Sequence, residues 1–181
     1  ETDLTHYLPS GVDTAAWRNY VYTGYVFVPD LTTGMGMIVY SRYGAGEDRY
    51  YSLQRDANRP AFHLAGPDGL DRLQGDLAQA EIPVEPETWY RFRIQVDTVT
   101  TTATHLRARV WKATEPMPAA DQIVAVDAGG GRIASGGVGL WAAWGDRAYF
   151  DDLRVHQNQR VLLSEGFVGL RPGEKPAGWV D

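Results

Sequence analysis

The stretch that decides the fold is GGVGLWAAWGDRAYFDDLRV, from Gly136 to Val155. Residues 138–144 are small, aliphatic or aromatic and carry no charge, and residues 148–155 form a second run of strand-like composition. Gly145 and Asp146 lie between the two runs, and a Gly-Asp dipeptide tolerates the positive φ angles of a tight turn. The pattern therefore predicts a β-hairpin with its turn at Gly145-Asp146.

Two adjacent carboxylates, Asp151 and Asp152, lie inside the second of these strands. Successive residues of a strand point to opposite faces of its sheet, so only one of the pair faces water unless the strand bulges. A carboxylate that is turned inward has to be paired, hydrogen-bonded or bound to a metal ion. The pair is the most informative polar feature of the chain.

The composition bounds the class of protein. The chain has 181 residues, 44% of them hydrophobic, and a net charge of −6, which suits one folded all-β domain and argues against a nucleic-acid partner. It contains no cysteine, which excludes disulfides, thiolate metal sites and thiol nucleophiles. No run approaches the 18 apolar residues of a membrane-spanning helix.

Short strands separated by turn residues follow one another along the chain, which predicts an all-β fold, a two-sheet antiparallel β-sandwich. Residues 70–80 are ambiguous, because their leucines have helical spacing; a short strand plus loop is preferred, with a single helical turn as the alternative. Besides the two strands above, the predicted strands span residues 17–28, 34–43, 49–55, 61–64, 88–99, 105–112, 123–126 and 161–167.

Two of these strands have a clear alternation. In residues 88–99 the aromatic and aliphatic positions Tyr90, Phe92, Ile94 and Val96 share one face, and the positions between them carry tryptophan, arginine and glutamine. Residues 105–112 repeat the pattern. Two such strands indicate a sheet that is buried on one side only.

The order of these motifs resembles a known family. VYSRYG, DRYYSLQR, WYRFRIQV, LRARVW, GGVGLWA and AYFDDLRV occur in that order between residues 17 and 155, as in concanavalin A-like, laminin G-type jelly rolls of bacterial extracellular, carbohydrate-active proteins. The resemblance implies a concanavalin A-like jelly roll that is extracellular or secreted, as a module of a larger protein. The same fold hosts lectins, glycosidases, lyases and adhesion modules, so it does not fix the activity.

The sequence departs from the family at its end. The segment SEGFVGLRPGEKPAGW, residues 164–179, resembles one that normally leads such modules. We expect residues 1–181 to form a single jelly-roll domain, in which residues 160–181 either complete the edge of the sandwich or begin a following module. The first alternative is preferred, because Leu162, Leu163 and Phe167 are costly to leave exposed.

Jelly rolls of this type often carry a structural calcium ion, so the resemblance implies a calcium site in this chain as well. Calcium takes carboxylate and carbonyl oxygens, and the implied ligands are Asp152, Asp151 and Glu165. The alternative is a hydrogen-bonded aspartate that caps a neighbouring loop.

We expect the function to be non-catalytic binding of a polysaccharide or glycan, on a sheet face where rings stack on sugars and arginines bond their hydroxyls or carboxylates. Many arginines favour an acidic glycan; the alternative is a solvated face over which arginine stems lie. One of Trp141 and Trp144 is expected in the core, because they have opposite parity. The predicted binding residues are Arg42, Tyr50, Gln54, Arg91, Arg93, Arg107, Arg109, Trp111 and Trp141.

An enzyme on the same fold, a glycoside hydrolase or a polysaccharide lyase, is the alternative from another class. The Glu-x-Asp-x-x-Glu string of jelly-roll glucanases does not occur, and nothing fixes the mutual geometry of His63, His105 and the tyrosines. A structural or adhesion module without a sugar ligand is the third alternative.

Overall fold

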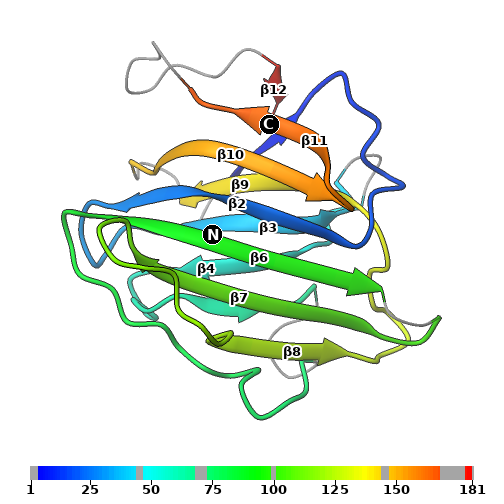
Figure 1. The fold of residues 1–181 in the computed structure, drawn as a ribbon, viewed down its shortest axis with the longest axis horizontal. Coiled ribbons are helices and arrows are strands. Elements are labelled where there is room, and N and C mark those ends of the chain that lie inside the picture. Colours follow the sequence, from blue (N-terminus) through cyan, green and yellow to red (C-terminus); the bar gives the residue numbers. More distant parts are fainter. Residues whose placement is uncertain are drawn as a thin grey trace.

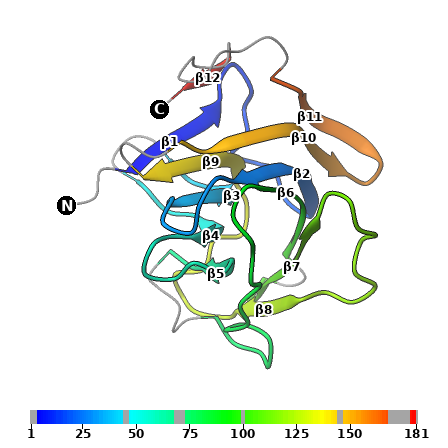
Figure 2. The same cartoon turned by 90° about the vertical axis from the view of Figure 1, so that its left-hand side faces the viewer.

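A computed structural model describes residues 4–43, 47–67, 73–98, 101–143, 147–167 and 178–180, with strands and no helix in these ranges. All pairings between neighbouring strands are antiparallel. The predicted two-sheet antiparallel sandwich is thereby confirmed (Figure 1 and Figure 2). The first sheet has the order β12 (Trp179–Val180), β1 (Leu4–Pro9), β9 (Gly137–Ala143), β3 (Met35–Ser41), β4 (Tyr51–Arg55) and β5 (His63–Ala65). The second has the order β11 (Arg160–Glu165), β10 (Tyr149–Gln157), β2 (Tyr20–Val28), β6 (Thr88–Thr98), β7 (Thr104–Lys112) and β8 (Ile123–Asp127).

The hairpin predicted for residues 136–155 is wrong. Its two strands exist as β9 and β10, but β9 lies in the first sheet between β1 and β3, and β10 lies in the second between β11 and β2. Figure 2 shows them in different layers. Residues 137–141 are all buried, as expected for a central strand, and β1 and β3 pair with β9 on its two sides. The predicted turn at residues 145–146 falls outside the described residues.

The alternation in the second sheet follows the prediction. In β2 and β6 every second side chain is buried, and the same holds for most of β7 and for β8. The inward side chains of both sheets form one hydrophobic core, in which Tyr22 and Phe92 meet edge to face with their ring centroids 5.2 Å apart. The side chains between them point away from the core and form the outer face of the second sheet.

Two tyrosine hydroxyls tie the sheets together across the core. The Tyr20 hydroxyl, from the second sheet, donates to the carbonyl of Gly137 at 2.9 Å and accepts from the backbone N–H of Tyr40 at 2.8 Å, both in or beside the first sheet. The Tyr51 hydroxyl, from the first sheet, donates to the carboxylate of Asp127 at 2.7 Å, at the end of β8. Asp127 is completely buried, so this bond satisfies a carboxylate inside the sandwich.

Two strands that the sequence did not assign lie at one edge of the first sheet. β1 lies before the first predicted strand, and it pairs with β9 over residues 4–7 and with β12 at Leu8 and Pro9. Trp179 is buried and packs edge to face on Phe167, with centroids 5.6 Å apart. Residues 73–80 form no strand beyond the isolated bridge of Gln74 to Val126, and turn bonds follow at Ala78 and Ala80.

Candidate functional site

The outer face of the second sheet carries rows of side chains at matched positions of neighbouring strands. One row runs Tyr149, Phe27, Trp89 across β10, β2 and β6. The next row runs Asp151, Tyr25, Arg91, Trp111, from β10 to β7. Two further rows are polar and include the pairs Arg93–Arg109 and Gln95–Arg107. Five of the predicted binding residues therefore share this face: Arg91, Arg93, Arg107, Arg109 and Trp111.

Aromatic rings dominate one end of this face. Phe27 lies between Trp89 and Tyr149, with centroid distances of 5.3 and 5.8 Å. The guanidinium carbon of Arg91 lies 5.3 Å from the ring centre of Tyr25 and 5.6 Å from that of Trp111, a cation–π arrangement that holds the side chain in place. Trp89 remains 41% exposed, so its indole ring faces water.

Four of these rings are absent from the predicted binding residues: Tyr25, Phe27, Trp89 and Tyr149. A usable signal was present, because Tyr25 and Phe27 have the parity of the outward positions in the aromatic strand of residues 20–28. What the sequence does not contain is the pairing of that strand with residues 88–98 and 149–157, which places the rings side by side.

Carboxylates neutralise most of the arginines at the other end of the face. Arg107 donates to Asp97 at 3.0 Å, and Arg109 donates to Asp121 at 2.6 Å and to the carbonyl of Pro118 at 2.9 Å. Arg93 instead donates to the side-chain oxygen of Gln95 at 2.8 Å. Burial and then the nearby Arg109 lower the pKa of Arg93, although Asp121 and Asp97 oppose the shift.

The other four predicted binding residues lie with the first sheet, so the expectation of a single surface is wrong. Trp141 is in β9 and Gln54 in β4; Tyr50 and Arg42 flank the strands β4 and β3. The prediction assumed that all arginine- and aromatic-bearing strands were neighbours, and the sandwich separates them into two layers. Trp141 is 4% exposed and packs over Gly36, where an added Cβ would collide with its indole. Trp144 falls outside the described residues.

A small polar cluster lies beside Trp141. His6 lies opposite Trp141 in the pairing of β1 with β9. Its Nε2 shares a hydrogen bond with the Tyr50 hydroxyl at 3.1 Å, and its Nδ1 lies 3.5 Å from a carboxylate oxygen of Asp48. Tyr43 stacks edge to face on the same imidazole. Burial raises the pKa of Tyr50 to about 12, so its hydroxyl keeps its proton at neutral pH.

Two buried histidines make the stability depend on pH. Burial lowers the pKa of His6, although Asp48 opposes the shift, and burial likewise lowers that of His63. Below the ordinary histidine pKa of 6.5 the unfolded chain therefore binds protons more readily than the folded one, so stability is present above this pH and is lost as the pH falls. We expect the free energy of unfolding, measured in urea on both sides of this pH, to drop on acidification, and the drop to shrink in a His6→Gln, His63→Gln variant. An equal drop in both proteins would contradict the assignment.

The adjacent aspartates both face water. The register between β10 and β2 shifts between Asp151 and Arg154, and Asp152 has a φ of 53°, so a β-bulge turns both carboxylates outward. Asp152 accepts a bond from Arg154 at 3.2 Å. Glu165, in β11, lies opposite Leu153, next to the bulge. The described ranges contain no group of three or more histidine, aspartate or glutamate side chains arranged around a common point. Calcium at Asp151, Asp152 and Glu165 stays a prediction from the sequence.

In the part of the chain that the structure describes, no helix is long and apolar enough to cross a membrane. No protein-family model matches the chain, and no curated protein sequence does. Among solved structures, the chain is similar to the carbohydrate binding module CBM66 from Bacillus subtilis, at 13% identity and a TM-score of 0.48, over 87% of this chain and 84% of that one.

Proposed function

We propose that the protein is a non-catalytic carbohydrate-binding module of a larger extracellular protein, with a concanavalin A-like jelly-roll fold, and that a glycan lies along the outer face of its second sheet. The observation that carries the proposal is the aromatic end of that face. Phe27, Trp89 and Tyr149 form a contiguous row, and Arg91 is held between Tyr25 and Trp111 in the next row.

Exposed rings on a strand surface suit the apolar faces of sugars. A pyranose presents C–H groups on one face and hydroxyls around its rim, so it can pack on a ring while a neighbouring guanidinium bonds its oxygens. Trp89 offers the exposed ring, and Arg91 is a fixed donor one row away. Because strand pairing and ring contacts already hold these groups, binding would cost little conformational entropy.

The charges on the face favour an acidic glycan. Asp97 and Asp121 neutralise Arg107 and Arg109, but no carboxylate lies within ion-pair distance of Arg91 or Arg93 among the described residues. A guanidinium is a planar fork that matches the two oxygens of a carboxylate. We infer that these two arginines bind uronate units of the ligand, and that raising the ionic strength weakens binding.

We expect Trp89→Ala to weaken glycan binding by about tenfold or more, since burying a large apolar side chain contributes about 1.5–3 kcal/mol. The measurement is affinity electrophoresis in gels that contain alginate, polygalacturonate, glucuronoxylan, mixed-linkage glucan or galactomannan, with pull-downs on cellulose and chitin. Tyr43→Ala is the matched control: Tyr43 is 47% exposed but lies with the first sheet, so its removal should leave binding intact.

Two arginine variants distinguish residues that bind the glycan from residues that stabilise the fold. Arg93→Ala should weaken retention without unfolding, because within the described ranges the Arg93 guanidinium hydrogen-bonds to Gln95 alone. Arg109→Ala removes the tie to Asp121 and Pro118, so its melting temperature should fall along with any binding. If wild-type protein is retained by no polysaccharide of the panel, or if Tyr43→Ala and Trp89→Ala behave alike, the proposed function is wrong.

The second candidate is a polysaccharide lyase centred on the first sheet, which the Tyr50–His6–Asp48 cluster favours. A tyrosine hydroxyl within hydrogen-bond distance of an imidazole, itself near a carboxylate, is a set of groups that can take a proton from carbon and deliver one to a leaving oxygen. The same panel discriminates: unsaturated products that absorb in the ultraviolet, lost in Tyr50→Phe, would establish the lyase.

A further inference from the structure

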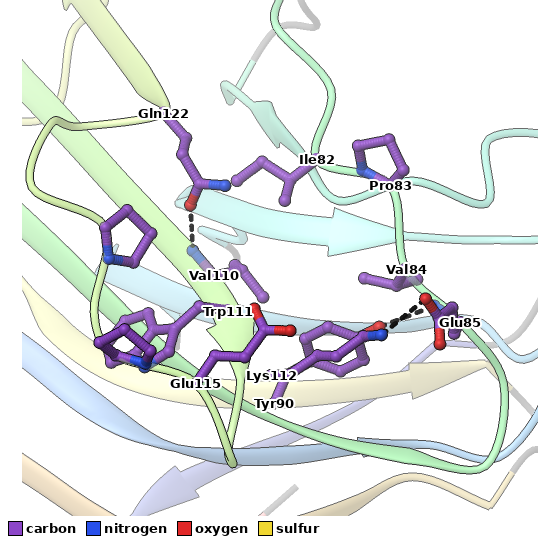
Figure 3. A pocket seen from close by; sticks show the side chains of 12 residues that line it. Ile82, Pro83, Val84, Glu85, Tyr90, Val110, Trp111, Lys112, Glu115 and Gln122 are labelled. Atoms are coloured by element: carbon purple, nitrogen blue, oxygen red, sulfur yellow. Dashed lines mark hydrogen bonds and ion pairs between the residues drawn. The ribbon is translucent and has the colours of Figure 1, made fainter.

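A pocket of about 320 Å³ lies where β8 stops covering the edge of β7. The pairing of these strands ends at Ala108 and Ile123, so the last residues of β7 have no strand beside them on that side. The side chain of Gln122 takes over, and its oxygen accepts the backbone N–H of Val110 at 2.7 Å. Figure 3 shows the opening between this part of β7 and the segment of residues 82–85.

Both walls of the pocket are anchored. The first wall, residues 82–85, is tied to the first sheet by two backbone bonds between Ile82 and Phe62, and to the second by the bond from Glu85 N–H to the Tyr90 hydroxyl at 2.7 Å. The second wall, residues 113–122, is held through the bonds of Arg109 to Asp121 and Pro118. The cavity therefore exists before any ligand arrives.

Trp111 belongs to both the pocket and the outer face. Its ring carries Arg91 on the outer face, and the same residue lines the pocket. The Trp111 side chain is buried, with 8% of its surface exposed. Its Nε1–H nevertheless has no hydrogen-bond partner among the described residues. A buried donor of this kind is costly to leave unpaired, and a ligand oxygen would satisfy it.

The remaining lining suits a neutral ring with hydroxyls. Apolar side chains form the walls, and Glu115 lies at the rim with the ion pair of Lys112 and Glu85, whose atoms are 2.7 Å apart (Figure 3). No ion pair of Glu115 occurs in the described ranges, although Lys112 lies near enough to interact with its charge. The Glu115 carboxylate can accept bonds from hydroxyls, and it repels a carboxylate. The volume is at the small end of ligand pockets, which fits one sugar ring rather than several.

We propose that this pocket is a second subsite, which holds one neutral sugar ring of the same glycan whose acidic units lie on the outer face. The inference rests on the proposed function and narrows it: the ligand is a heteropolysaccharide with both uronate and neutral units. Trp111 Nε1–H donates to a ring hydroxyl, and the Glu115 carboxylate accepts from another.

The test follows the indole N–H signal of Trp111 by two-dimensional NMR, with Trp111→Phe used to assign it. The probes are the methyl glycosides of glucose, galactose, mannose and xylose, each added alone, and glucuronate and galacturonate as charged counterparts. We expect at least one neutral glycoside to shift the signal and its uronate counterpart to shift it less. Val84→Phe, which fills the pocket, should abolish the shift, and Glu115→Gln should weaken binding about tenfold while Glu87→Gln, outside the pocket, does not.

The outcomes separate this inference from the proposed function. If polysaccharide binding depends on Trp89 but no neutral glycoside moves the Trp111 signal, the pocket is not a subsite and the proposed function stands. If a glycoside shifts the signal in Glu115→Gln as strongly as in wild type, the assigned contact is wrong. If no polysaccharide is retained and no glycoside shifts the signal, both fail. Should Val84→Phe not fold, as judged from its melting curve, Glu115→Gln alone decides.

Discussion

Replacing Gly136 by alanine is expected to destabilise the protein by about 3 kcal/mol or more, through overpacking and backbone strain together. Gly136 has a φ of 153°, and a Cβ there would lie 2.6 Å from the carbonyl carbon of Tyr40 and against the carbonyl oxygen of Ser41. These are backbone atoms, which cannot rotate away as a side chain can. Tyr40 itself has a φ of 50° at the irregularity between β3 and β9, so the neighbouring chain has little freedom to yield.

The measurement is urea unfolding of Gly136→Ala beside a second glycine variant. Gly130→Ala is the control, because a Cβ at Gly130 meets no atom within 4 Å. For a chain of this size a loss of 3 kcal/mol corresponds to roughly 6–12 °C in melting temperature. An equal free energy of unfolding for the two variants would show that the backbone of Tyr40 and Ser41 leaves room for a Cβ at Gly136.

Tyr20→Phe is expected to cost about 3 kcal/mol, because it strips two buried backbone groups of their partner at once. The hydroxyl of Tyr20 serves Gly137 carbonyl and Tyr40 N–H, and each buried polar group left unsatisfied costs about 1–3 kcal/mol. The phenylalanine ring keeps the edge-to-face contacts with Tyr40 and Trp17, so the loss reports the hydrogen bonds and not the packing.

Tyr22→Phe is the matched control, two residues away in the same strand. The Tyr22 hydroxyl is buried, and it has no hydrogen-bond partner among the described residues; burial raises its pKa well above the ordinary value. Removing an unsatisfied buried hydroxyl should leave stability unchanged or raise it slightly. The two variants lose the same atom from the same strand, so a similar free energy of unfolding for both would refute the role of Tyr20 in joining the sheets.

Strand positions and their inward parity could be predicted from the sequence, because both depend on residues close together in the chain. The alternation in residues 88–98 and 104–112 is local, and the structure places Tyr90, Phe92, Ile94 and Val96 in the core as predicted. The same locality explains the failure at β1. Its six residues have little pattern of their own, and they form a strand because β9 and β12 lie on either side.

Strand partners could not be predicted, and the candidate site depends on them. Residues 137–143 and 149–157 are neighbours in sequence and lie in different sheets of the fold. The assignment of Arg42, Tyr50, Gln54 and Trp141 to the same surface as Arg91 failed for this reason. Conversely, the ring row of Phe27, Trp89 and Tyr149 arises from three strands whose adjacency no local pattern encodes.

The position of β1 between β9 and β12 has a consequence for how the chain reaches this fold. Leu4 pairs with Ala143 and Leu8 with Val180, so both partners of the first strand come from far later in the sequence. Closing such long loops is entropically expensive and slows the rate-limiting step of folding. While the ribosome makes the chain, β1 leaves the exit tunnel long before either partner exists, with its edges unprotected. β1 is short and ends in a proline, and both features limit its pairing with the strands of other chains before β9 and β12 are made.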